Sequence, residues 1–117
     1  MLDDPARSPR DVRAEHPKPE AWVRCRVCKA EVARIRDQTE LGELNVFVNP
    51  AGHVFELALF RHAPGAVARG EPSFEFSWFP GHAWRFAHCR GCGVQLGWRF
   101  EGSSQFWGLN RGSLAWP

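Results

Sequence analysis

Residues 73–100, SFEFSWFPGHAWRFAHCRGCGVQLGWRF, are the most informative stretch of the sequence, because they combine aromatic residues at strand spacing with a pair of cysteines. Three of the chain's six tryptophans lie in it. Successive side chains of a strand alternate between its two faces, so the spacing predicts three strands, each with its aromatic side chains on one face. A turn at residues 79–81 separates the first two. The aromatic residues of the predicted strands are, in order, Phe74, Phe76 and Trp78; Trp84 and Phe86; and Trp98 and Phe100.

Three adjacent strands of this kind would gather the indoles around one spot, as a large core or as an aromatic box that binds a ligand. Aromatic residues at strand spacing more often form a core. The small residues Ser77, Gly81 and Gly97 lie beside the tryptophans and let another group approach the backbone, which favours a box. A buried indole N–H also needs an acceptor, so three tryptophans are a costly core filling. The pattern alone leaves both interpretations open.

Two Cys-x-x-Cys motifs, Cys25/Cys28 and Cys89/Cys92, lie sixty residues apart. Two thiolates in one tight turn can bind an ion, and two such turns complete a tetrahedral shell of four sulfurs. Sulfur ligands select zinc or iron. The spacing therefore predicts a structural Zn²⁺ that ties the first strand to the late hairpin. The alternatives are a redox dithiol and a ligand role for His88, beside Cys89.

The length of 117 residues favours one small domain, and the composition argues against nucleic-acid and membrane partners. The net charge is only +2, and lysine and arginine are scattered along the chain, so no nucleic-acid partner is expected. No apolar run approaches the length of a membrane span, and residues 1–20 lack the hydrophobic segment of a secretory signal. We therefore expect a cytoplasmic, monomeric protein, and a reducing cytosol favours metal over disulfides.

The remaining segments predict an all-β domain with a tail before it. Residues 1–20 are rich in proline and charge, which predicts a disordered tail or, alternatively, a docking segment for a partner. Residues 21–117 form the predicted domain. Frequent turn signals and the lack of helical periodicity favour short strands. The further predicted strands are 21–25, 45–49, 53–60 and 106–109, with a turn at 50–52 and loops at 37–44 and 61–71. Residues 29–37 could form a strand or a helix, and their place directly after a cysteine motif favours a strand.

Five motifs of the sequence together resemble the CULT domain, the thalidomide-binding domain of cereblon. In chain order they are CRVC, VNPAG, FSWFPGHAWRFAHCRGCG, LGWRF and FWGL. The resemblance covers residues 21–114, has the motifs in the family's order, and is greatest to the bacterial single-domain members. It implies a β-tent-like fold of two antiparallel sheets with a structural Zn²⁺. Animal cereblon carries His where this chain has Phe76, so a side-chain hydrogen bond is lost there.

The resemblance also implies a binding site. In CULT domains three tryptophans and a fourth aromatic residue enclose an uncharged cyclic imide of the glutarimide or thalidomide type, or a uracil-type ligand. In this chain the walls would be Trp78, Trp84 and Trp98, with Phe100 as the fourth. The backbones of Phe76 and Trp78 would hold the imide edge. The residues implied to bind the ligand are Asn49 at the rim, Phe76, Ser77, Trp78, Trp84, Trp98 and Phe100.

Cereblon also binds C-terminal cyclic imides on damaged proteins, so such a protein end is a further expected ligand. The 117 residues leave no room for the Lon-like region of cereblon or for its contacts with a ligase adaptor, and no ubiquitin-ligase partner is expected. A cage for a methylated ammonium is the alternative ligand class. It would call for a carboxylate, but Glu75 and Glu101 have the opposite parity to their aromatic neighbours and should point away.

No enzyme activity and no catalytic residue are expected. A methionine sulfoxide reductase of the B type has a similar zinc-pinned fold, but its chemistry needs a nucleophilic cysteine beyond the four metal ligands. A zinc-ribbon nucleic-acid binder would stack bases on the aromatic residues but would need a basic groove. Ser77 and His82 could be proposed as a nucleophile and its base, but an isolated serine and histidine near an aromatic cluster are more often structural.

Overall fold

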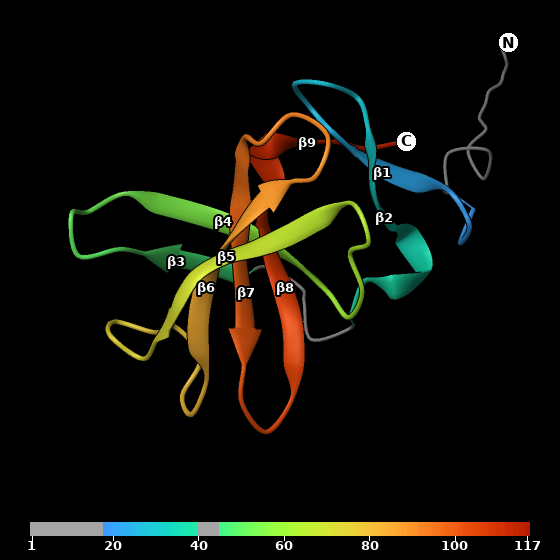
Figure 1. Ribbon diagram of the computed structural model, residues 1–117. Helices are drawn as coiled ribbons and strands as arrows, with labels where there is room; N and C mark the ends of the chain where they lie inside the picture. Colours follow the sequence, from blue (N-terminus) through green and yellow to red (C-terminus); the bar gives the residue numbers. More distant parts are fainter. Residues whose placement is uncertain (1–17, 40–44) are drawn as a thin grey trace, which may run out of the picture.

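The computed structural model describes residues 18–39 and 45–117, and its strands lie in two antiparallel sheets (Figure 1). The small sheet has the order β2-β1-β9, and the large sheet has the order β3-β4-β8-β7-β6-β5. This confirms the predicted all-β class with two antiparallel sheets. The elements are β1 (Trp22–Cys25), β2 (Glu31–Arg34), η2 (Ile35–Asp37), β3 (Asn45–Val48), β4 (Val54–Phe60), β5 (Ala66–Ser73), β6 (Ala83–Cys89), β7 (Gln95–Glu101), β8 (Gln105–Asn110), η3 (Arg111–Ser113) and β9 (Leu114–Ala115).

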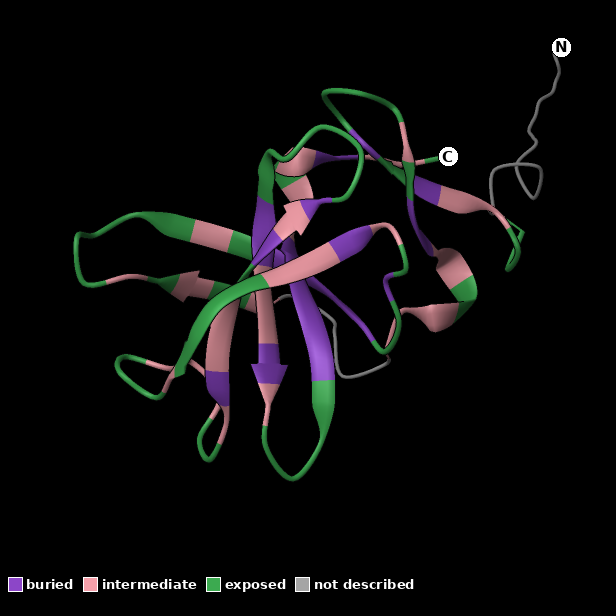
Figure 2. Cartoon of the chain, in the orientation of Figure 1, coloured by how far each residue is buried: buried purple, intermediate pink, exposed green. Residues whose placement is uncertain are grey.

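The main core lies where the small sheet packs against the large one, and Figure 2 shows the buried residues of both sheets concentrated there. Val23 of β1 and Val32 of β2 face Phe60 of β4 and Leu109 of β8, and none of the four is exposed. A second cluster lies in the large sheet and includes Leu57. Buried apolar area of this kind is the main favourable contribution to folding.

β5 corrects the predicted loop at 61–71, because its first six residues lie within that range. Gly70, with φ +88°, and Pro72 read as loop signals in the sequence. β5 is an edge strand that pairs only with β6, and the pairing is interrupted between Arg69 and Ser73. An edge strand tolerates glycine and proline because one side of its backbone needs no partner.

The predicted strand from Phe74 to Trp78 is wrong. These residues form a turn and an irregular segment between β5 and β6, and Phe76 has a φ of +57°. Phe74 and Phe76 are both 69% exposed, so they do not share a buried face with Trp78. The alternating aromatic pattern arose here without a strand. β6 and β7 do place their aromatic residues as predicted.

The C-terminal segment holds a short strand, β9, that the sequence did not indicate. Leu114 pairs with Cys25 of β1, and Ala115 pairs with Arg24. β9 follows η3 directly, so the end of β8 in the large sheet continues into the small sheet. The two sheets are therefore joined by this connection as well as by their shared core.

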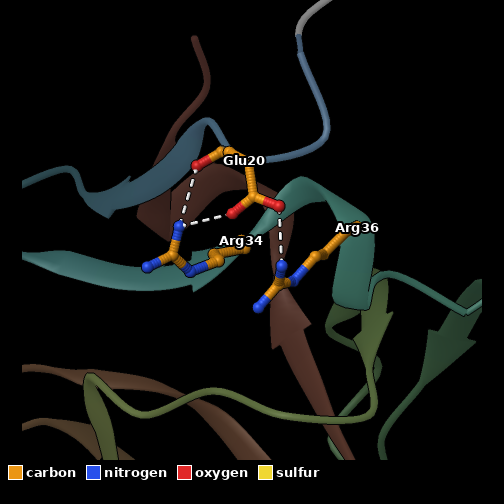
Figure 3. A network of polar contacts seen from close by, with 3 residues as sticks. All are labelled: Glu20, Arg34 and Arg36. Carbon is orange, nitrogen blue, oxygen red and sulfur yellow. Dashed lines mark hydrogen bonds and ion pairs between the residues drawn. The ribbon is translucent and has the colours of Figure 1, made fainter.

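Most of the predicted tail, residues 1–17, lies outside the described residues, as do residues 40–44 of the predicted loop 37–44. Residues 18–20 are part of the folded domain. The carbonyl of Pro19 accepts a hydrogen bond from the Arg36 N–H at 2.9 Å. The Glu20 carboxylate contacts Arg34 at 2.8 Å and Arg36 at 2.6 Å (Figure 3). The boundary of the domain thus lies before Pro19.

Two truncations test this boundary. Deleting residues 1–17 should leave the melting temperature unchanged. Deleting residues 1–20 removes the Glu20 carboxylate, whose exposed ion pairs contribute at most about 1 kcal/mol, and should lower the melting temperature by roughly 4 °C. Thermal unfolding followed by circular dichroism measures both. Equal melting temperatures for the two truncations would show that residues 18–20 contribute nothing to stability.

No helix in the part of the chain that the structure describes is long and apolar enough to cross a membrane.

Candidate metal site and ligand cavity

The two cysteine motifs form turns of the same design. In each, the N–H of the first cysteine donates to a carbonyl five residues later: Cys25 to Ala30 at 2.9 Å, and Cys89 to Val94 at 2.8 Å. The residue after the second cysteine has a positive φ in both turns, +67° at Lys29 and +83° at its glycine counterpart. One turn follows β1 and the other joins β6 to β7, and Figure 1 shows them side by side.

The four cysteine sulfurs lie within 4.8 Å of one another. The Sγ atoms of Cys25 and Cys92 are 3.8 Å apart, and those of Cys28 and Cys89 are 3.6 Å apart. A tetrahedral zinc with sulfurs at about 2.3 Å would separate them by about 3.8 Å, so the cluster fits such an ion. The four cysteines can therefore hold a metal ion, and this ion would link the small sheet to the β6–β7 hairpin.

The surroundings of the cluster shift the pKa values of its cysteines in opposite directions, up for Cys28 and Cys92 and down for Cys89. Burial alone would raise the pKa of Cys89, but hydrogen bonds from the backbone N–H groups of Cys92 and Gly91 lower the pKa to about 7. His88 is not part of the cluster in the described chain. Its Nδ1 lies 3.0 Å from the carbonyl oxygen of Gly93, which explains its place beside Cys89 without a ligand role.

A cavity of about 430 Å³ opens on one face of the large sheet. Three elements supply the tryptophans: β6 carries Trp84, β7 carries Trp98, and the segment between β5 and β6 carries Trp78. The turn between β3 and β4 adds its residues to the wall. The cavity is lined by Asn49, Pro50, Phe55, Glu75, Phe76, Trp78, Trp84, Phe86, Gln95, Leu96, Gly97, Trp98, Phe100, Asn110 and Ser113.

The pairing of β6 with β7 puts four aromatic side chains on one face. Trp84 lies opposite Phe100, and Phe86 lies opposite Trp98. Since alternate residues of a strand share a face, all four point to the same side of the sheet. Phe100 is 1% exposed and closes the bottom of the cavity.

Hydrogen bonds and ring contacts fix the tryptophans. The Trp78 indole N–H donates to the Val48 carbonyl at 3.1 Å, and the Trp84 indole N–H donates to the Glu75 carbonyl at 2.8 Å. The rings of Trp78 and Trp98 meet edge to face, with centroids 5.0 Å apart. The three indoles also pack on the second core cluster. They therefore contribute to the core on one side and line the cavity on the other, so both interpretations of the pattern apply.

The structure brings most of the predicted ligand-binding residues to this cavity. Ser77 is the exception: it does not line the cavity, and its hydroxyl donates to the Phe79 carbonyl at 3.2 Å. Asn49 lines it, and the Asn49 side chain also accepts from the His53 N–H at 2.8 Å. The residues that line the cavity as predicted are Asn49, Phe76, Trp78, Trp84, Trp98 and Phe100.

Further lining residues were not predicted from the sequence. Phe86 shares the parity of Trp84, and this signal could have placed it at the cavity. Phe55 lies on β4, which comes close only through the sheet order, so no local pattern indicated it. Glu75 also lines the cavity, and the parity argument does not apply to it, because residues 74–78 do not form a strand. Glu101 does not line it and lies 3.5 Å from Arg85.

Ser77 and His82 do not form a nucleophile–base pair. The His82 ring nitrogens lie 2.9 Å from the Pro80 carbonyl and 3.1 Å from the Ser104 hydroxyl. Ser77 makes its contacts with the Phe79 backbone. Both side chains stabilise the turns in which they lie.

Gly97 allows β7 and β8 to approach each other beside the cavity. A Cβ atom at Gly97 would lie 2.3 Å from the Gly108 carbonyl oxygen, a backbone atom that cannot move aside. Gly97→Ala should therefore cost about 2 kcal/mol and lower the melting temperature by roughly 8 °C. Gly112→Ala is the matched control, because its Cβ would meet only ordinary contacts, the nearest at 3.7 Å. Equal effects of the two substitutions in thermal unfolding would show that the close approach of β7 and β8 does not require a glycine at position 97.

No family model matches the chain. The chain is 40% identical to the protein cereblon of Gallus gallus over 79 residues, which cover 62% of this chain and 18% of that protein. It is 42% identical to cereblon of Xenopus tropicalis over 79 residues, with the same coverage of 62% and 18%. It is 36% identical to cereblon of Drosophila grimshawi over 89 residues, which cover 72% of this chain and 13% of that protein. The chain thus spans less than a fifth of the length of these curated relatives.

Proposed function

The chain carries a cereblon-type (CULT) domain, and from this premise we propose that it is a binding module, not an enzyme, for uncharged cyclic imides. Glutarimide and thalidomide-type rings are the proposed ligands, with uracil-type rings as relatives that share the N–H between two carbonyls. A C-terminal cyclic imide on a protein is the proposed macromolecular form. The tryptophan cavity is the proposed site.

One observation carries the proposal: the free backbone groups at the aromatic wall. Among the described residues, neither the carbonyl of Phe76 nor the N–H of Trp78 has a hydrogen-bond partner. An imide edge offers the complement, a donor beside an acceptor. The apolar walls would pack on the ring methylenes, and a ligand without the imide edge would leave buried polar groups unsatisfied.

The cavity mouth suits a ligand that continues outward. Phe76 lines the cavity and is 69% exposed, and Asn49 lies on the turn between β3 and β4. A substituent on the imide ring, or the polypeptide that precedes a C-terminal imide, would leave the cavity between these two residues. Exposed aromatic side chains at a rim provide contact area for such a segment.

For the four-cysteine cluster we propose a structural Zn²⁺, because a tetrahedral set of four thiolates is the usual zinc shell. Four cysteine ligands leave no open coordination position for a substrate or a water molecule, so the ion would stabilise the fold and have no catalytic role. We propose a reducing, cytoplasmic setting, in which free thiols persist. We also propose that the protein is a monomer and that it binds no ubiquitin ligase, nucleic acid or membrane.

Tryptophan fluorescence titrated with glutarimide, uridine and trimethyl-lysine tests the ligand class. Glutarimide and, more weakly, uridine should quench or shift the emission of the cavity tryptophans in a saturable way. Trimethyl-lysine should not compete. Because Glu75 lines the cavity, a cation cage is the second candidate function, and tight binding of trimethyl-lysine alone would establish it in place of the imide site.

Salt provides the control for this titration. A neutral imide should bind with nearly the same affinity at low and high ionic strength, since salt screens only charges. A methylated ammonium beside a carboxylate should bind less tightly as the salt concentration rises. A strong salt dependence for glutarimide would contradict a neutral site.

A further inference from the structure

A second cavity, of about 610 Å³, lies on the other side of the large sheet. β7 contributes to both cavities, because Trp98 lines the tryptophan cavity and the next residue, Arg99, lines the second one. Successive residues of a strand point to opposite faces of the sheet. Residues of β2 and of η2, which follows it, also line the second cavity. We call this second cavity the arginine cleft, after Arg34, Arg36, Arg61, Arg90 and Arg99 in its lining.

The arginine cleft concentrates positive charge. Its lining has five arginines and one acidic residue, Asp37, which leaves four positive charges, whereas the whole chain carries only +2. The arginines are scattered along the sequence, so their spacing predicted no basic surface, and only the fold brings them together. A cavity lined by one sign of charge raises the local concentration of the opposite ion.

Arg99 is held in place before any ligand binds. Its guanidinium lies over the Trp107 ring, 4.8 Å from the centroid, and donates to the Gln105 side chain at 2.6 Å. Its Nε is buried and has no hydrogen-bond acceptor among the described residues. The nearest carboxylate oxygen, on Glu101, lies 3.9 Å from it. A guanidinium that is already oriented loses little conformational entropy when it binds an anion.

Arg90 is fixed in a similar way. Its Nε donates to the Pro64 carbonyl at 3.1 Å, and one terminal nitrogen donates to the Ala66 carbonyl at 3.4 Å. These bonds use neutral acceptors, so the charge of Arg90 is not neutralised. Arg61 makes no ion pair with another described residue and is exposed.

Glu20 shows how an oxyanion sits at one end of the cleft. Its two carboxylate oxygens lie 2.8 Å from Arg34 and 2.6 Å from Arg36, and Figure 3 shows the carboxylate between the two guanidinium groups. The Glu20 side chain is 62% exposed, so its ion pairs contribute little to stability and an incoming anion can displace it. With Glu20 and Glu101 counted beside Asp37, the five arginines still exceed the neighbouring carboxylates by two.

We propose that the arginine cleft binds a compact, multiply charged phosphate group, such as the diphosphate of a phosphorylated small molecule, and that Glu20 is its internal competitor. Guanidinium groups pair with phosphate oxygens through parallel hydrogen bonds. A diphosphate carries more negative charge and more acceptor oxygens than one carboxylate, which suits a cleft that the Glu20 carboxylate only partly neutralises. This site does not depend on the imide cavity, and the two can be occupied at once.

Isothermal titration with inorganic pyrophosphate tests the proposal on the full chain. The protein should bind it at low salt, and affinity should fall steeply as salt rises. The double variant Arg36→Gln, Arg61→Gln should bind at least about tenfold more weakly, because two charged donors are lost. Glu20→Gln should bind more tightly than the unsubstituted protein. Arg69→Gln removes an exposed charge outside the cleft and should leave the affinity unchanged.

Several outcomes would overturn the proposal. One is the absence of pyrophosphate binding in the millimolar range at low salt, and another is equal binding by the double variant, with its fold verified by circular dichroism. Tighter binding of citrate than of pyrophosphate would show a carboxylate site. Binding of a single-stranded oligonucleotide without binding of pyrophosphate would show that the cleft is a nucleic-acid surface instead.

Discussion

Cys25→Ser is expected to unfold the domain or to lower its melting temperature by more than about 15 °C, since a structural metal contributes several kcal/mol and each is worth about 4–8 °C in a domain of this size. Cys25 is fully buried at the end of β1, and its sulfur lies 3.8 Å from that of Cys92. Removing one ligand opens the shell that joins the small sheet to the β6–β7 hairpin. Thermal unfolding by circular dichroism, with metal analysis by mass spectrometry, measures the effect.

Chelation of the unsubstituted protein is the matched control for this substitution. If the metal accounts for the loss, then prolonged treatment with a strong chelator should lower the melting temperature to that of the serine variant, and added Zn²⁺ should restore only the unsubstituted protein. Folded protein that contains no metal, and whose stability the chelator leaves unchanged, would contradict a structural ion.

Trp84→Ala should weaken glutarimide binding by about 30-fold, because truncation of a central aromatic anchor commonly costs about 2 kcal/mol. Trp84 forms one wall of the cavity, and its indole N–H holds the Glu75 carbonyl at 2.8 Å. The substitution therefore removes stacking and also releases the segment that carries Phe76 and Trp78. Calorimetric titration, with circular dichroism to verify the fold, measures the loss.

Trp84→Phe and Phe74→Ala separate the two parts of this effect. Trp84→Phe keeps an aromatic wall but loses the bond to Glu75, so its affinity should lie between those of the unsubstituted protein and Trp84→Ala. Phe74 is 69% exposed and does not line the cavity, so Phe74→Ala should change the binding free energy by no more than about 0.5 kcal/mol. An equal loss in Trp84→Ala and Phe74→Ala would mean that ligand binds elsewhere.

The parts of the fold that could be predicted from the sequence depend on local chemistry. A Cys-x-x-Cys turn is formed by neighbouring residues, so both turns could be predicted from the cysteine spacing. Their proximity in the fold could be predicted because a metal ion in such a site takes four sulfur ligands. Trp84 and Trp98 were predicted on one face, because alternation along β6 and β7 needs no knowledge of distant residues.

The parts that could not be predicted depend on partners far along the chain. β5 contains Gly70 and Pro72, and only its pairing with β6 makes it a strand. β9 exists because Leu114 meets Cys25 across the whole length of the domain. Conversely, residues 74–78 alternate like a strand, but no strand in the described part of the chain pairs with them, so they form an irregular segment. For the same reason the parity argument does not apply to Glu75, which lines the cavity.

Calorimetric titration of glutarimide and of N-methylglutarimide into the same protein sample tests whether the cavity recognises the imide edge. The two ligands share size and neutrality, and they differ in the N–H that would donate to the free Phe76 carbonyl at the cavity wall. We predict saturable binding of glutarimide and no detectable binding of the N-methyl compound, because the methyl group removes the donor and collides with the backbone. Equal affinity for both would contradict recognition of the imide edge.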